Sequence, residues 1–257
     1  MASKARVLRL RPAKYASPTP TPTLAFATRL YHSNDHPPPS GPFTPTETTI
    51  LSSALPYVPS HGFTLTSLSL GAKDAGYIDA STNLFPMGAF SLVHYHLVTQ
   101  RLALAQHRDL LETANPDQRQ LGISAKVRAL AWQRLMGNKE VIHRWQEALA
   151  LMAQLSNVPT ATKELASLAD EIWFLAGDTS VDTSWYTKRA SLSAIYAATE
   201  LHMTTDKSPG FKDTSDFLDR RLEDAKAVGQ AVGGLGKWVG FTTHAGINVL
   251  RSKGVRI

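Results

Sequence analysis

The chain has 257 residues, of which 43 % are hydrophobic, so it can bury the core of one domain or of two small ones. It contains no cysteine, which excludes disulfides and cysteine-ligated zinc or iron–sulfur sites. The net charge of +6 is uneven, because residues 1–43 hold six basic side chains against one acid and residues 225–257 hold five against none. The body between them is net acidic, which disfavours nucleic-acid binding along it, whereas the basic C-terminal segment suits an anionic membrane.

The first 43 residues have the composition of a targeting segment. Residues 1–34 are rich in Arg, Ser and Thr and contain no acid, which is typical of a mitochondrial transit peptide. The run from Arg29 to Ser33 resembles a matrix-processing site. Prolines within 36–42 prevent a helix and indicate a linker. We therefore predict a transit peptide and linker over 1–43, the alternative being a basic leader without a targeting role.

The segment 44–229 is predicted to be helical throughout. Thr44 and Glu47, with a proline between them, form a capping box, and apolar residues then recur at helical spacing. Proline, glycine and asparagine interrupt that spacing at intervals, and no alternating strand pattern is found. The expected fold class is therefore all-α. The predicted helices, about nine, run over 44–55, 64–76, 79–84, 88–114, 120–135, 139–154, 160–176, 182–205 and 211–229.

Residues 44–96 are expected to form a helix-turn-helix-like part of this domain. A helix ending at Gly76, a short helix at 79–84 and a long helix opening near Gly88 resemble the tetracycline-repressor architecture. A ligand-responsive DNA-binding regulator is therefore the alternative function. The short helix contains no Arg or Lys for phosphates or guanine edges, which favours a scaffold that binds no nucleic acid.

Catalytic and metal-binding motifs are weak. Glu140 and His143 have the E-x-x-H spacing of di-iron bundles, but a second such pair is missing. His94 and His96 are two residues apart, which places them on different helix faces and favours packing over metal ligation. The sequence therefore predicts neither an enzyme nor a bound metal or cofactor.

Residues 170–221 carry a pattern at fixed spacing that identifies a family. The pattern comprises Asp170-Glu171-Ile172-Trp173, Ala176-Gly177-Asp178, Ser180, Asp182, Trp185-Tyr186-Thr187-Lys188-Arg189, Ile195-Tyr196, Thr199-Glu200-Leu201, Ser208-Pro209 and Phe217-Leu218. With this pattern the chain resembles, from about Ile50 to Arg251, the mitochondrial coenzyme Q (ubiquinone) biosynthesis accessory proteins, ninth in the usual naming of that pathway.

This resemblance implies a tetracycline-repressor-like fold that has lost DNA binding and holds an isoprenoid or other lipid in an apolar cavity. It also implies a homodimer, peripheral on the matrix side of the inner mitochondrial membrane. The implied partners are the di-iron demethoxyubiquinone hydroxylase, which would receive its polyprenyl substrate from this protein, and the coenzyme Q biosynthetic complex.

A partner-binding surface is predicted at the start of the helix over 182–205. Tryptophan, tyrosine and arginine gathered at one place match the composition of binding hot spots. The alternative is that the aromatic residues pack internally and that Arg189 pairs with Asp170 or Glu171. The predicted surface consists of Asp170, Glu171, Trp173, Trp185, Tyr186 and Arg189.

The lipid is expected to lie against apolar faces of the later helices. Apolar residues at helical spacing also describe an ordinary core, so each position remains a hypothesis. The candidate lipid-binding residues are Trp132, Leu135, Leu149, Met152, Leu168, Ile172, Leu192, Ile195 and Tyr196.

The tail over 230–257 is predicted to be an amphipathic membrane-binding helix. The uncharged run from Trp238 to Leu250 is shorter than the ~20 residues that a span requires. Several glycines weaken the helix, and the alternative is a tail packed on the body of the protein. The candidate membrane-binding residues are Leu235, Lys237, Trp238, Phe241, Val249 and Arg251.

Overall fold

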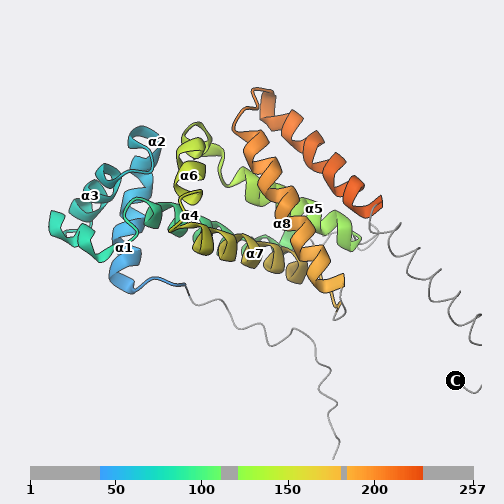
Figure 1. The fold of residues 1–257 in the computed structure, drawn as a ribbon, viewed down its shortest axis with the longest axis horizontal. Coiled ribbons are helices and arrows are strands. Elements are labelled where there is room, and N and C mark those ends of the chain that lie inside the picture. The colour runs from blue at the N-terminus through green and yellow to red at the C-terminus, as the bar shows by residue number, and fades with distance from the viewer. Residues whose placement is uncertain (1–40, 111–120, 181–183, 228–257) are drawn as a thin grey trace, which may run out of the picture. The chain divides into compact units, whose positions relative to one another are not determined.

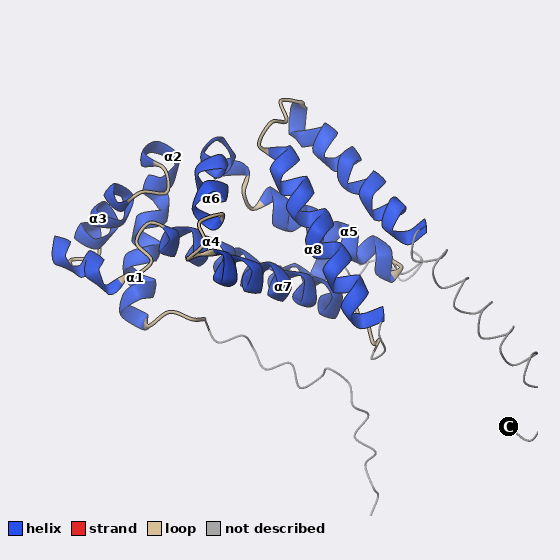
Figure 2. Cartoon of the chain, viewed as in Figure 1, coloured by secondary structure: helices blue, strands red, loops and turns tan. Residues whose placement is uncertain are grey.

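The computed structural model describes residues 41–110, 121–180 and 184–227. They belong to one compact unit, Asp35–Ile257. This part of the chain contains helices and loops and no strand (Figure 2). The α-helices are α1 (Pro45–Ala54), α2 (Val58–His61), α3 (Leu65–Asp74), α4 (Phe90–Ala103), α5 (Ile123–Met136), α6 (Trp145–Met152), α7 (Val158–Leu175) and α8 (Ser184–Met203), followed by a helix over 212–227 (Figure 1). The all-α prediction is confirmed.

The predicted capping box at the start of α1 is present. The Thr44 side chain accepts a hydrogen bond from the Glu47 backbone N–H, and the Glu47 carboxylate accepts one from the Thr44 N–H at 2.7 Å. The helix then packs closely on α3. This approach depends on Gly71, because a Cβ there would lie only 2.4 Å from the Cβ of Ala54.

The buried side chains form two clusters. The first joins α1, α3, α4 and α6 and includes Ile50, Leu68, Phe90 and Trp145. The second joins α5, α7 and α8, with Leu135 among its fully buried members. Helix α7 packs on both α8 and α4, so it connects the two clusters (Figure 1).

Several helices begin or end differently from the sequence prediction. Helix α4 ends at Ala103 and continues as a 3-10 segment, Leu104–Leu110, with a kink at His107. The predicted helix at 139–154 begins as a 3-10 segment, Lys139–Arg144, before α6. Helix α7 begins at Val158, with Pro159 in its first turn rather than before it, because the missing proline N–H needs no partner there.

The short predicted helix at 79–84 is present as a 3-10 segment, Asp79–Leu84. The chain reverses before it through Gly76, whose φ of 81° lies in the left-handed region that favours glycine. The predicted transit peptide and the predicted membrane-binding tail, Leu235 to Arg251 included, lie outside the described residues. Among the described helices, none is both long and apolar enough to cross a membrane.

Candidate functional site

A cavity of about 260 Å³ lies where five helices converge. Its walls are mostly aliphatic, with small residues of α7 leaving the space between larger side chains. The lining residues are Leu97 of α4; Arg134 of α5; Leu149, Met152 and Ala153 of α6 and its C-terminal cap; Ala161, Thr162, Glu164, Leu165 and Leu168 of α7; and Tyr196, Ala197 and Glu200 of α8. An apolar pocket with a few converging polar groups is the usual form of a small-molecule site.

A buried polar network forms one part of this wall. The Asn138 side chain lies at its centre, accepting hydrogen bonds from Arg134 Nη1 and His96 Nε2, both at 2.9 Å. Its amide donates to Glu200 Oε1 at 2.8 Å, and the Tyr196 hydroxyl donates to the same oxygen at 3.3 Å. All five residues are at least nine-tenths buried.

Burial governs the protonation of this network. It raises the pKa of Glu200 against the opposing influence of Arg134, and it raises the pKa of Tyr196 well above its ordinary value. Burial, with Arg134 nearby, lowers the pKa of His96 to about 4. The imidazole is therefore neutral at neutral pH, and its Nε2–H can donate to Asn138.

A second buried charge pair lies beside the cavity. Arg101 of α4 donates through Nε and Nη2 to the two carboxylate oxygens of Glu164, at 2.5 and 3.3 Å. The two side chains are about nine-tenths buried. This pair fixes α4 against α7 and places a neutralised carboxylate on the cavity wall.

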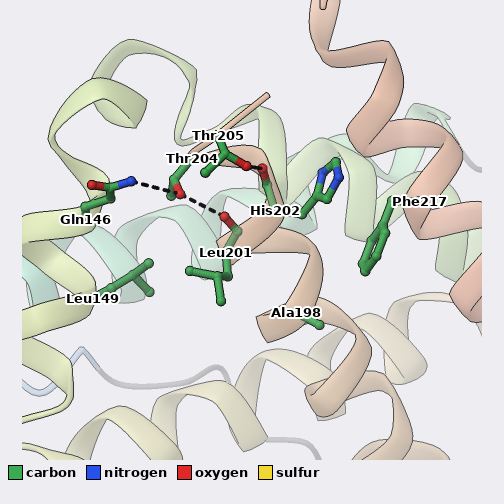
Figure 3. A pocket seen from close by; sticks show the side chains of 8 residues that line it. All are labelled: Gln146, Leu149, Ala198, Leu201, His202, Thr204, Thr205 and Phe217. Atoms are coloured by element: carbon green, nitrogen blue, oxygen red, sulfur yellow. Dashed lines mark hydrogen bonds between the residues drawn. The ribbon is translucent and has the colours of Figure 1, made fainter. Parts of the chain in front are cut away.

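A more open pocket of about 460 Å³ shares the lining residue Leu149 with the inner cavity, and its side chains are drawn in Figure 3. Its wall combines α6, the C-terminal end of α8 and the helix over 212–227. His202 stacks on Phe217 with ring centres 4.7 Å apart, and the Gln146 amide donates to the Thr204 hydroxyl at 3.5 Å. Leu149 lines both pockets, so the inner cavity and the open pocket lie next to each other at this side chain.

The structure brings four of the nine candidate lipid-binding residues to the inner cavity, namely Leu149, Met152, Leu168 and Tyr196. Of the others, Leu135, Ile172 and Leu192 are buried in the second core cluster, Ile195 packs against that cluster, and Trp132 packs there beneath Arg128. These five line neither pocket described above. The sequence analysis did not predict the polar lining residues Arg134, Glu164 and Glu200. The only indication of them in the sequence is that each is a charged residue on an otherwise apolar helix face.

The candidate partner surface gathers at the start of α8. Trp185 and Tyr186 make an edge-to-face contact with ring centres 4.7 Å apart, and Tyr186 is 71 % exposed. The Arg189 guanidinium lies 4.0 Å from the centre of the Trp185 ring, and its Nε donates to Asp170 at 2.5 Å. The ion pair between Arg189 and Asp170, predicted as the alternative to a partner contact, is thus present. Tyr186 nevertheless remains exposed on the surface.

The remaining candidates for this surface are less accessible. Trp173 is partly buried and donates through its indole nitrogen to the backbone oxygen of Lys188 at 3.2 Å. Glu171 is 6 % exposed, so its carboxylate belongs to the interior. Tyr186 is therefore the most exposed member of the candidate surface, whereas Trp185 and Asp170 are partly exposed.

The two histidine motifs make structural contacts. His94 and His96 are both buried, and Phe90 stacks on His94. His143 Nε2 lies 2.9 Å from the backbone oxygen of Pro59, which joins the 3-10 segment to α2. Within the described ranges, no group of three or more His, Asp or Glu could hold a metal ion.

The helix-turn-helix-like part presents few positive charges. Asp79 of the short 3-10 segment pairs with Lys73 at 3.3 Å, and the surrounding surface carries exposed apolar side chains such as Ile78 and Leu84. A DNA-reading surface instead needs basic side chains for the phosphates.

These features define an all-helical protein with a tetracycline-repressor-like fold and an apolar cavity. A solved TetR transcriptional regulator from Nitrosomonas europaea superposes with a TM-score of 0.53 at 15 % sequence identity, over 71 % of this chain and 99 % of that one. At this identity the likeness concerns the fold alone.

Sequence comparisons identify the family. A COQ9 family model matches residues 158–229, which include α7, α8 and the candidate partner surface. The mitochondrial ubiquinone biosynthesis protein coq9 of Schizosaccharomyces pombe is 36 % identical over 90 % of this chain and 89 % of its own length. The COQ9 proteins of Xenopus tropicalis and Homo sapiens are 38 % and 36 % identical, over 81 % and 70 % of this chain and 65 % and 57 % of their own lengths. The chain belongs to the COQ9 family, as its sequence pattern predicted.

Proposed function

We propose that this protein binds a polyprenyl-quinone intermediate of ubiquinone biosynthesis in its inner cavity and presents it to the di-iron demethoxyubiquinone hydroxylase. Family membership supports the role in ubiquinone biosynthesis and in the mitochondrion, since the relatives carry both in their names. In this role the protein is an accessory binder that needs no metal or organic cofactor of its own and no nucleic acid.

The observation that carries the proposal is the inner cavity. Aliphatic side chains from α4, α6 and α7 provide the surface that a prenyl chain needs, and Arg134 and Glu200 add polar groups to the wall. Its volume of about 260 Å³ is near the lower limit of small-molecule pockets. A long polyprenyl chain would therefore extend beyond the cavity, and the open pocket next to Leu149 offers apolar surface for it.

Presentation requires contact with the hydroxylase, which we assign to the start of α8. Exposed tyrosine beside tryptophan and arginine suits a binding hot spot, because aromatic rings bury much surface with little loss of side-chain entropy. The ion pair between Arg189 and Asp170 holds the guanidinium against Trp185, so this surface is ordered before it binds.

Delivery of a membrane-soluble quinone also requires a position at the membrane. The basic tail, predicted from sequence as an interfacial helix, supplies the contact with anionic lipid in this proposal. The protein would then sit peripherally on the matrix side of the inner membrane, as a homodimer. Binding of DNA is the weaker alternative, because the segment Asp79–Leu84 contains no basic residue and its one acid pairs with Lys73.

Native mass spectrometry of the purified full chain, alone and mixed with the hydroxylase, tests the proposal. We expect a co-purified prenylated quinone and a complex with the hydroxylase. Tyr186→Lys should weaken that complex without emptying the cavity, because its side chain is largely exposed. Tyr77→Lys is the matched control on a distant exposed tyrosine. Absence of both a co-purified lipid and a complex with the hydroxylase would refute the proposal.

A further inference from the structure

Arg134 is buried, and two of the three nitrogens of its guanidinium have no hydrogen-bond partner among the described residues. The residue is 1 % exposed and lines the inner cavity. Its Nη1 donates to Asn138, but Nε and Nη2 are buried and lack a hydrogen-bond partner among the described residues. Unpaired donors on a buried cation are costly, so such groups are normally satisfied by protein, water or ligand. Because Arg134 lines the inner cavity, a ligand that reaches its guanidinium there would satisfy these groups.

The two unused nitrogens form a recognisable binding edge. Nε and Nη2 lie on the same side of the guanidinium, and their N–H groups are parallel. Together they can donate two parallel hydrogen bonds to two neighbouring oxygen atoms. Arg101 uses this edge on Glu164 in the same molecule. The corresponding edge of Arg134 is therefore suited to a ligand with two adjacent hydrogen-bond acceptors.

The charge around Arg134 indicates a neutral ligand. Asn138 links its guanidinium to the Glu200 carboxylate, so the buried cation already has an acidic neighbour. A phosphate or carboxylate placed on the free edge would add a second acidic group beside Glu200 on the cavity wall. The ring of Tyr196, with its centre 5.9 Å from the guanidinium carbon, also lines the cavity and offers an aromatic surface.

We propose that the Arg134 end of the cavity is a headgroup subsite for an oxygenated aromatic ring. Nε and Nη2 donate to two adjacent ring oxygens, such as a quinone carbonyl and a neighbouring methoxy group. The prenyl chain then lies along the aliphatic wall formed by Leu149 and Leu168, away from Arg134. This inference rests on the proposed function, because it specifies which end of the prenylated quinone enters the cavity first.

The test compares probes that differ only in ring oxygens. The full chain is titrated with a singly prenylated dimethoxybenzoquinone, with an oxygen-free ring bearing the same prenyl group, and with a short-chain phosphatidate. We expect the wild-type protein to bind the quinone at least tenfold more tightly than the oxygen-free ring, which corresponds to one charge-assisted hydrogen bond. Equal affinity for these two probes would overturn the inference while leaving lipid binding intact.

Two arginine variants locate the effect. Arg134→Lys keeps the charge and removes the two-pronged edge, so it should abolish the preference for the quinone, measured as the ratio of its affinity to that of the oxygen-free ring. Arg101→Lys is the matched control, a buried arginine whose edge is already occupied by Glu164, and it should retain the preference. A folded Arg134→Lys protein with the wild-type preference would overturn the inference.

Three further results would also test the proposed headgroup subsite. Phosphatidate binding that is tighter than quinone binding and depends on Arg134 would assign the subsite to phosphate and overturn the neutral-ring proposal. Failure of every probe to bind would refute both this inference and the proposed lipid binding. If Arg134→Lys does not fold, the wild-type comparison of the quinone with the oxygen-free ring decides the question by itself.

Discussion

The side-chain amide of Asn138 donates a 2.8 Å hydrogen bond to the carboxylate of Glu200, which lies 62 positions further along the chain. Asn138 follows α5 and Glu200 belongs to α8, so this bond ties two helices on the wall of the cavity. The Asn138 oxygen also accepts hydrogen bonds from Arg134 and His96. One small side chain therefore provides a hydrogen-bond partner for three larger buried ones.

Asn138→Ala should therefore destabilise the fold strongly. The substitution removes three hydrogen bonds and leaves an arginine, a histidine and a carboxylate buried without that partner. We expect a loss of about 3 kcal/mol in the free energy of unfolding, measured by urea denaturation. Gln146→Ala, which removes a single exposed bond to Thr204, should cost under about 0.5 kcal/mol. Equal effects of the two substitutions would contradict the central role of Asn138.

His96 should make stability depend on pH in the mildly acid range. Its pKa is lowered from 6.5 to about 4 by burial, with Arg134 of α5 adding to the shift. Asn138 bonds its Nε2 and the Trp145 ring packs beside it, so the neutral form is the one accommodated. Between pH 6.5 and 4 the unfolded chain binds a proton that the folded chain does not, so stability falls as the pH falls.

The expected loss from His96 across that range is about 3 kcal/mol. Urea denaturation at about pH 7 and about pH 4.5 measures it, and His96→Gln should flatten the dependence. His143→Gln, at an exposed position, should keep the wild-type slope. An unchanged slope in His96→Gln would show that other groups control acid sensitivity.

The sequence predicts some of these features better than others, for physical reasons. The capping box of Thr44 and Glu47 is recognisable because both partners lie within one helical turn. The network of Asn138 and Glu200 is not, since its bonds join residues far apart in the chain. Apolar spacing correctly marks Ile172 and Leu168 as inward-facing, but only the packing of α7 against its neighbours shows that Leu168 faces a cavity and Ile172 does not.

Gly71→Ala should destabilise the contact between α1 and α3. A Cβ at this position would lie 2.4 Å from the Ala54 Cβ and 2.5 Å from its backbone atoms, so the helices must separate. The better helix propensity of alanine, about 1 kcal/mol, works against this loss. We expect a net loss of about 1–3 kcal/mol by thermal or chemical denaturation.

The control for this substitution is Gly41→Ala, because a Cβ there meets no atom within 4 Å. Its stability should remain within about 0.5 kcal/mol of the wild type. If Gly71→Ala were as stable as this control, α1 and α3 would have room to separate slightly. The close contact between them would then not require glycine at position 71.

Replacing one residue of the buried pair Arg101 and Glu164 should destabilise the fold more than replacing both. Arg101→Met leaves the Glu164 carboxylate buried without its partner, so we expect a loss of about 3–5 kcal/mol in unfolding free energy. Replacing both residues, as Arg101→Met with Glu164→Leu, removes both desolvation costs and should recover most of that stability. Because Glu164 also lines the cavity, the double variant is expected to make the cavity more apolar. A double variant no more stable than Arg101→Met would show that the pair contributes through packing between α4 and α7 rather than through charge compensation.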